Sequence, residues 1–284
     1  MSERLTITVL VDNNVSGDLQ AEHGFAVLIE HNNQRILFDA GQNEALFYNA
    51  KKLGIQLTGL DEIILSHGHY DHGGNLEWLL KNNPNANLHL HPDCLQTRYS
   101  IDARGIRNIA LSESAVTAIK NTLLCRVKAN SQPSQVTSAI NLTGQIERKQ
   151  PLELCSGPFY LDKQADKEDL LLDDQSLWIN TKQGIVIITG CCHAGIENTV
   201  TKIQKQSSTQ QIHTILGGLH LHNARSERLQ HSADFLQSLQ LKQLYPGHCT
   251  GKEAQALLKE RLGEKVVQRC EAGLTVSFDI YNEN

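Results

Sequence analysis

Nine residues, Ser66 to Gly74, constrain this chain more than any other stretch. They read Ser-His-Gly-His-Tyr-Asp-His-Gly-Gly, which places three imidazoles and a carboxylate within six residues. An apolar run, 63–65, leads in and a helix-like run, 75–82, leads out, so we predict a strand, a metal-binding loop and a helix. Alternate side chains of an extended segment point the same way, so His67 and His69 can hold one ion. Asp71 and His72 lie past the bend and suit a second ion. These ligands fit Zn²⁺, and Fe or Mn fits the same cage.

The same unit of strand, glycine turn, histidine and helix recurs later in the chain. It places His193 after the apolar strand 184–189 and His248 after the strand 241–245, and His220 follows Gly217-Gly218 in a fourth such loop. Sites in layered α/β folds form in the loops at one end of a sheet. We therefore predict that the four loops converge on one pocket.

The alternation of predicted strands and helices indicates an α/β fold with one domain. The segment from Pro92 to Phe159 breaks this alternation, and we expect an inserted cap or lid at about residues 93–159. Its arginines, Arg104 and Arg107, either bind an anionic substrate or lie on a solvated surface.

Composition excludes several classes of protein. The chain has 284 residues, of which 40% are hydrophobic and 20% charged, and a net charge of −5 without a basic block, so nucleic acid is not favoured. No apolar stretch approaches membrane-spanning length, and the first residues predict a strand and not a secretory signal. Seven cysteines without a CxxC pair suggest free thiols in a reducing compartment. We expect a cytoplasmic protein with a small-molecule substrate and no nucleic-acid or membrane partner; the sequence leaves the oligomeric state open.

The motif His67-x-His69-x-Asp71-His72-Gly73-Gly74 resembles the signature of the metallo-β-lactamase superfamily. The resemblance implies an αββα sandwich of two mixed β-sheets flanked by helices, and a metal-dependent hydrolase that activates a water with one or two ions. It also implies that Asp39, in Asp39-Ala40-Gly41, supports the metal loop from behind, although a simple turn residue is the alternative. Carried over to this sequence, the first ion takes His67, His69 and His193, and the second takes Asp71, His72 and His248.

The sequence departs from the superfamily pattern at the bridging ligand. No histidine lies between His91 and His193, and Cys191 stands where an aspartate is usual. Asp174 and Cys191 are the two candidates for the bridge. We favour Asp174, because it opens the predicted strand before that of His193, so that antiparallel pairing can bring it to the same edge, and because a carboxylate is a hard ligand that resists oxidation.

Further runs narrow the resemblance to one branch of the superfamily. Asp-Asp-Gln-Ser-Leu, Thr-Gly-Cys-Cys-His-Ala-Gly, Gly-Gly-Leu-His-Leu and Gly-His-Cys-Thr-Gly, in this order, resemble the dihydropterin–ribofuranosylaminobenzene phosphate synthase-like metal-dependent hydrolases. We expect Asp71 and His220 to act in catalysis, with His220 as a substrate ligand or general acid; a rim histidine held by hydrogen bonds is the alternative. We expect His23 to lie behind the ligands.

Three functions are compatible with these residues. The first is a metal-dependent hydrolase of an ester, phosphoester or related bond in a small molecule. The second is an enzyme that condenses a pterin with an arylamine. The third is a metal-binding sensor without activity, which the full set of metal ligands makes the weakest of the three.

Overall fold

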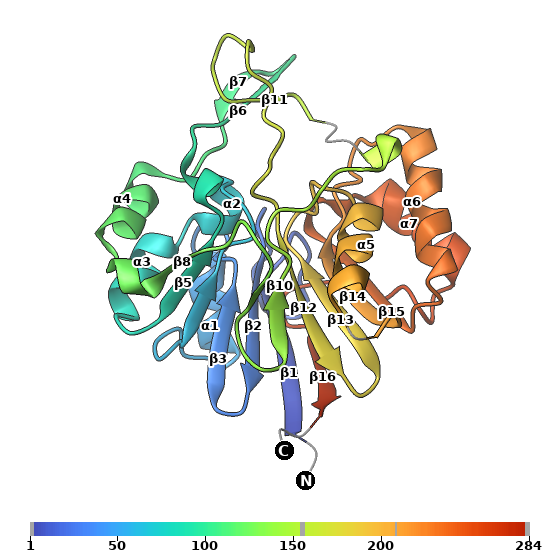
Figure 1. Cartoon of the computed structure of the whole chain (residues 1–284), viewed down its shortest axis with the longest axis horizontal. Helices are drawn as coiled ribbons and strands as arrows, with labels where there is room; N and C mark the ends of the chain where they lie inside the picture. The colour runs from blue at the N-terminus through green and yellow to red at the C-terminus, as the bar shows by residue number, and fades with distance from the viewer. Residues whose placement is uncertain (1–2, 154–156, 208, 282–284) are drawn as a thin grey trace.

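The computed structural model describes residues 3–153, 157–207 and 209–281, and two facing β-sheets form its centre (Figure 1). One sheet has seven strands in the order β16-β1-β2-β3-β4-β5-β8. The other has six strands in the order β15-β14-β13-β12-β10-β9. Both sheets mix parallel and antiparallel pairs, as predicted.

The seven-stranded sheet and the helices beside it come mainly from the first half of the chain. Their bounds are β1 Glu3–Val11, β2 Ala26–His31, β3 Gln34–Phe38, α1 Ala45–Lys52, β4 Glu62–Ile64, α2 Tyr70–Gly73, α3 Leu76–Asn82, β5 Asn87–Leu90, η1 Pro92–Leu95, α4 Glu113–Asn121, η2 Leu124–Arg126, β8 Val127–Ala129 and, from the C-terminal end, β16 Thr275–Ile280.

The six-stranded sheet and its helices come from the second half. Their bounds are β9 Ser134–Gln135, β10 Ile140–Leu142, η3 Pro151–Glu153, β12 Ser176–Thr181, β13 Gly184–Thr189, α5 Ile196–Gln206, β14 Ile212–Gly218, α6 Ser226–Ser238, β15 Gln243–Gly247, η4 His248–Thr250 and α7 Lys252–Leu262.

Three hydrophobic layers hold these elements together, and strand β13 shows why. Its side chains are buried along its whole length, as expected for a strand that is covered on both faces. Val186 and Ile188 point into the core between the two sheets, whereas Ile185 and Ile187 pack with residues of α5, α6 and α7. A third core lies between the seven-stranded sheet and α1, α3 and α4. The predicted αββα layering is thus present (Figure 1).

The parallel strands determine where a site can form. β13, β14 and β15 run parallel to one another, as do β3, β4, β5 and β8. The carboxyl ends of parallel strands lie at the same edge of a sheet, so the loops after β4, β13, β14 and β15 gather at one edge of the sandwich.

The predicted inserted segment, 93–159, divides in the structure. β8 joins the seven-stranded sheet, and β9 and β10 join the six-stranded sheet, so these parts belong to the layers. A separate three-stranded sheet, in the order β11-β6-β7, stands beyond the strand ends at the top of Figure 1. It consists of β6 Tyr99–Asp102, β7 Gly105–Asn108 and β11 Phe159–Tyr160. Of the predicted insertion, only this small sheet lies outside the two main sheets in a position to act as a lid. Its role as a lid stays a prediction.

Among the described residues, no helix combines the length and the apolar character needed to cross a membrane.

Candidate metal centre

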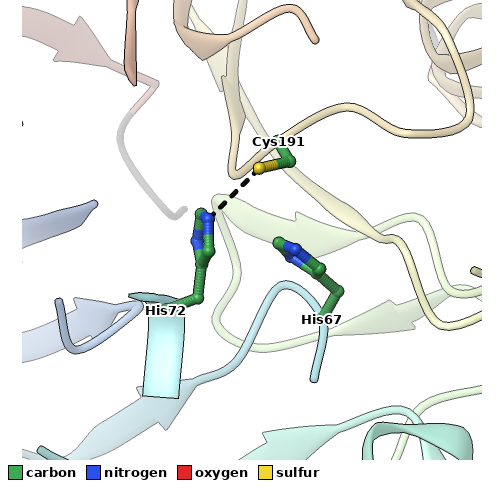
Figure 2. A group of neighbouring side chains, drawn as sticks. All are labelled: His67, His72 and Cys191. Atoms are coloured by element: carbon green, nitrogen blue, oxygen red, sulfur yellow. Dashed lines mark hydrogen bonds between the residues drawn. The ribbon is translucent and has the colours of Figure 1, made fainter. Parts of the chain in front are cut away.

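The structure brings all four predicted histidine loops to one place at this edge. The described His and Cys side chains there form overlapping groups whose possible ligand atoms lie within 4.8 Å of one another. Figure 2 shows part of this cluster, with His67 and His72 on one side and Cys191 opposite them. Of the predicted metal ligands, only Asp174 belongs to none of these groups.

His67, His69 and His193 form the first subsite. Nε2 of His67 lies 3.0 Å from Nδ1 of His69, and the three possible ligand atoms lie within 4.8 Å of one another. All three rings are buried, and burial, followed by the positive charges of neighbouring groups, lowers their pKa values, that of His69 to about 3. The three imidazoles are therefore neutral at physiological pH, which is the form that binds metal.

Asp39 orients the imidazoles of both subsites from behind. Its Oδ1 accepts the backbone N–H of Ser66 at 2.7 Å, and its Oδ2 accepts the Ser66 hydroxyl at 2.8 Å. Oδ2 also lies 2.6 Å from Nδ1 of His72, and the Ser66 hydroxyl lies 2.9 Å from Nδ1 of His67. Because a carboxylate only accepts hydrogen bonds, Nδ1 of His72 carries the proton. The Ser66 hydroxyl donates its only proton to Asp39, so its oxygen accepts a hydrogen bond from Nδ1 of His67. In both rings Nε2 is therefore the nitrogen left to face the cluster. The predicted support by Asp39 is present in this geometry.

Gly190 makes this close packing possible. It directly precedes Cys191, and a Cβ at this position would lie 2.2 Å from Oγ of Ser66 and 3.0 Å from Oδ2 of Asp39. Any larger residue would therefore push the supporting network away from the imidazoles that it orients.

Asp71, His72, His248 and Cys191 form the second subsite. Nε2 of His72 lies 3.1 Å from Nε2 of His248 and 3.3 Å from Sγ of Cys191. Oδ2 of Asp71 lies 3.4 Å from Nε2 of His248 and 3.7 Å from Nε2 of His72. Nε2 of His72 thus lies within 3.7 Å of a possible ligand atom of each of the other three residues.

The loop after β1 holds His248 in this position. Asp12 accepts the backbone N–H of His248 at 2.8 Å, and Oδ1 of Asn13 lies 3.0 Å from Nδ1 of the ring. The Asn13 amide also donates to the carbonyl oxygen of His248 at 3.1 Å. Nε2 is therefore the ring nitrogen that faces Asp71.

The donor set fits a transition-metal dication on two observations. Nε2 of His69 and both ring nitrogens of His193 are buried without a hydrogen-bond partner among the described residues, which is costly unless another group binds there. In the second subsite, burial lowers the pKa of His248, but the charges of Cys249 and Asp71 outweigh it and raise that pKa to about 9. Surroundings that favour a proton at this nitrogen also favour a metal cation.

Contrary to our expectation, Asp174 does not group with the other ligand candidates. Strand β12 begins only at Ser176, so Asp174 lies in the preceding turn, where its Oδ2 accepts the backbone N–H of Ala194 at 2.9 Å. Asp174 thus holds the loop that carries His193. The sulfur of Cys191 takes the place beside His67 and His72 (Figure 2).

Asp173 and Gln175 support the first metal loop in the same way. Asp173 accepts the backbone N–H of Gly68 at 2.7 Å and forms a buried bidentate ion pair with Arg98, at 2.7 and 2.8 Å. Gln175 donates its backbone N–H to the Ser66 carbonyl at 3.0 Å. The run Asp173–Gln175 therefore supports two metal loops, and none of its side chains belongs to the described ligand groups.

His220 and His23 border the cluster. The centroids of the His220 and His193 rings are 4.1 Å apart. The possible ligand atoms of His220, Cys191 and His193 lie within 4.8 Å of one another. Nε2 of His23 lies 3.2 Å from Oδ2 of Asp71, so His23 contacts the second subsite through this carboxylate. Its half-exposed ring also stacks on His248, with 5.3 Å between centroids. The catalytic role of His220 stays a prediction.

Phe159 is a site residue that the sequence analysis missed. From strand β11 its ring lies 5.6 Å from the rings of His69 and His193 and 5.9 Å from that of His220, between centroids. The small sheet therefore places an aromatic cover over the first subsite. No local sequence motif indicates this role for Phe159.

Asn13, which contacts His248, was also missed. The sequence did offer an indication of its role, because Asn13 belongs to a polar run directly after the predicted first strand.

Arg104 and Arg107 are engaged with a neighbour in the β6–β7 hairpin. Nη2 of Arg104 lies 2.6 Å, and Nη2 of Arg107 2.9 Å, from Oδ2 of Asp102. Asp102 thus offsets part of the positive charge that they would present to an anionic substrate.

The two-sheet sandwich and the histidine cluster at its strand edge together define a metallo-β-lactamase fold with a candidate metal centre. Residues 19–113 match the metallo-beta-lactamase superfamily. The chain belongs to this superfamily, as predicted.

Two proteins of Methanocaldococcus jannaschii resemble nearly the whole chain. An uncharacterized protein is 34% identical over 257 residues, which cover 89% of this chain and 94% of that protein. The other is named 7,8-dihydropterin-6-methyl-4-(beta-D-ribofuranosyl)-aminobenzene-5'-phosphate synthase, and is 30% identical over 272 residues, which cover 91% of this chain and 90% of that protein. The second match confirms the branch inferred from the motifs.

Solved structures agree on the fold. A metal-dependent hydrolase of the beta-lactamase superfamily superposes with a TM-score of 0.81 at 27% identity, over 97% of this chain and 99% of that one. Zn²⁺-bound PqqB from Methylobacterium extorquens has a TM-score of 0.57 at 12% identity, over 95% of this chain and 99% of that one. At this identity PqqB shows the fold alone.

Proposed function

We propose that this chain is a metal-dependent hydrolase that cleaves an ester, phosphoester or related bond in a small molecule. One observation carries the proposal: side chains that could hold metal ions form overlapping groups at a single strand edge. His67, His69 and His193 would hold one ion. Asp71, His72, His248 and Cys191 would hold a second. Imidazole, carboxylate and thiolate are all zinc ligands, so Zn²⁺ is the first choice, and Fe or Mn fits the His and Asp ligands.

Such ions supply Lewis acidity and lower the pKa of an attacking water toward neutrality. The chain's own groups hold and move the protons. Burial raises the pKa of Asp71, but His72 and His248 outweigh it and lower that pKa far below its ordinary value. Asp71 therefore stays ionised at neutral pH and can accept a hydrogen bond from the water, which orients it. His220, at the border of the cluster, can donate a proton to the leaving group. Phe159 covers the first subsite and limits the access of bulk water.

Metal content tests the ligand assignment. Purified protein should carry one or two transition-metal ions per chain, measured by elemental analysis. His69→Ala should remove most of this metal, because the first subsite then keeps only two imidazoles. His213→Ala is the matched control, since His213 bonds Thr214 at the start of β14 and lies in none of the described ligand groups. Full metal content in His69→Ala would contradict the assignment of His69 as a metal ligand.

A substrate panel tests the reaction. Metal-loaded protein should cleave at least one of a chromogenic phosphodiester, phosphomonoester, thioester or lactone, and His69→Ala should lose this activity with its metal. We propose a small and anionic substrate, because the site lies beneath a small sheet that carries Arg104 and Arg107. Metal-loaded protein that turns over nothing in a broad panel would favour the sensor.

The likeness to the named synthase favours a second candidate, the condensation of a pterin with an arylamine. In that reaction the arylamine nitrogen displaces a diphosphate from the pterin's methyl group and loses a proton, and bound metal ions would stabilise the leaving diphosphate. Incubation with a dihydropterin methyl diphosphate and an aminobenzene ribofuranosyl phosphate separates the candidates. A coupled product with released diphosphate supports condensation, whereas diphosphate release without coupling supports hydrolysis.

A further inference from the structure

Two thiols face each other at the border of the second subsite. Cys191 follows β13 and Cys249 lies in η4, after β15. Their sulfur atoms lie within 4.8 Å of each other, and Sγ of Cys249 donates to the carbonyl oxygen of Cys191 at 3.3 Å. Both cysteines are free.

Gly218 allows the two sulfurs to meet across strand β14, which separates β13 from β15. A Cβ at Gly218 would lie 2.6 Å from Sγ of Cys249 and 3.3 Å from Cα of Cys191. The end of β14 therefore leaves open the space between the two thiols.

The two thiols differ in their access to solvent, and the neighbouring cysteine points elsewhere. Cys249 is partly exposed, whereas Cys191 is buried. Cys192 is also buried, but its sulfur lies 3.4 Å from Oγ1 of Thr199, within the core beneath α5. A small oxidant thus reaches Cys249 first, and Cys191 is the thiol placed to react with it next.

We propose that Cys249 is a site of oxidation by peroxides, and that Cys191 resolves the oxidised sulfur by forming a disulfide with it. In the first step the Cys249 sulfur attacks one oxygen of hydrogen peroxide, which yields a sulfenic acid and one water. In the second step the Cys191 sulfur displaces the sulfenic hydroxyl, which leaves with a proton as a second water. The two thiols lose two electrons in all, and a dithiol reductant reverses the change.

The disulfide would disable the second subsite. Sγ of Cys191 lies 3.3 Å from Nε2 of His72, and a bond to Cys249 would prevent this sulfur from becoming the thiolate that binds a metal ion. Conversely, an ion that holds Cys191 shields it from the sulfenic acid. Metal binding and disulfide formation therefore compete. This consequence rests on the proposed metal site, whereas the disulfide itself rests only on the contact between the two thiols.

Peptide mapping of the full chain tests the proposal. Metal-stripped protein is treated with one equivalent of hydrogen peroxide, alkylated and digested with trypsin. We expect the peptides 183–202 and 243–252 to be joined, with a loss of two hydrogens that dithiothreitol restores. In protein that is loaded with Zn²⁺ before the peroxide treatment, far less of this disulfide should form. Oxidised protein should bind less Zn²⁺ than reduced protein, and reduction should restore the binding.

Variants show which sulfurs react. Cys191→Ser and Cys249→Ser should each lose the link, whereas Cys192→Ser should keep it, because Cys192 shares the peptide but faces the core. A link that persists in Cys191→Ser, or Cys249 that proceeds to sulfinic acid without a link, would overturn the proposal. Loss of bound Zn²⁺ in Cys249→Ser would also overturn it, since Cys249 would then be a metal ligand. If the protein binds no metal but forms the link, the proposed metal centre fails and the oxidation site stands.

Discussion

Replacing Asp39 by Asn tests whether the support behind the imidazoles controls metal binding. The carboxylate accepts three hydrogen bonds, from the backbone and hydroxyl of Ser66 and from the ring of His72. An amide of the same shape has only one acceptor oxygen, and its NH₂ group cannot accept the bonds at Oδ2. Either His72 changes its tautomer, which moves a proton onto the nitrogen that faces the cluster, or a buried donor loses its partner.

The expected loss has two measurable parts. Removing a partner that orients a ligating histidine typically costs about 10–100-fold in metal affinity, or about 1.4–2.8 kcal/mol. The metal-free protein should also lose about 1–3 kcal/mol of its free energy of unfolding, because one buried donor is left unpaired. Competition with a chromophoric chelator measures the affinity, and urea unfolding of metal-free protein measures the stability.

Asp61→Asn is the matched control for Asp39→Asn. Asp61 is exposed, precedes the same strand β4 and accepts a backbone N–H, that of Arg35, at 2.8 Å. This variant should keep its metal affinity. If Asp39→Asn binds metal as tightly as wild type while its fold is intact, the Asp39 carboxylate does not set the orientation of the imidazoles.

Three further predictions concern the loops and the small sheet. Burial raises the pKa of Asp174 to about 6, so the folded protein binds its proton more tightly than the unfolded chain does. The contribution of Asp174 to the free energy of unfolding of the metal-free protein should therefore fall by up to about 3 kcal/mol between about pH 4 and pH 6. The buried neutral histidines act in the opposite direction, equally in wild type and in Asp174→Asn, so the prediction concerns the difference between these two proteins. Asp174→Asn should lack this fall and keep its metal, and parallel pH curves from urea unfolding would contradict the reasoning. Arg98→Met leaves the buried carboxylates of Asp173 and Asp169 without their cation, and should lower the free energy of unfolding by about 3–5 kcal/mol; a loss below about 1 kcal/mol in urea unfolding would show that those carboxylates find other partners. Trimming the tip of the β6–β7 hairpin, residues 103–106, should change the ratio of kcat/KM between substrates more than the metal content, and an unchanged activity profile would count against a lid.

Local patterns in the sequence were enough to predict an α/β fold and most residues of the candidate metal centre, whereas the αββα layering was predicted from the resemblance to the superfamily. The apolar run of β13 and the spacing of His67, His69, Asp71 and His72 depend on backbone geometry over a few residues, which the chain carries with it in any context. The loops after β13, β14 and β15 could be grouped in advance for a related reason. Parallel strands with helical connections leave their carboxyl ends at one edge, so three histidines distant in sequence meet there.

Only the tertiary structure decided between Asp174 and Cys191. Both residues lie beside the ends of neighbouring strands, and the sequence does not tell where β12 begins. Because β12 starts at Ser176, Asp174 falls in a turn and its carboxylate binds a backbone N–H of the next loop. The same holds for Asn13 and Phe159, which reach His248 and the first subsite from strands far away along the chain. Such contacts depend on how two sheets and a small third sheet pack together, and packing is a property of the whole chain that no local spacing encodes.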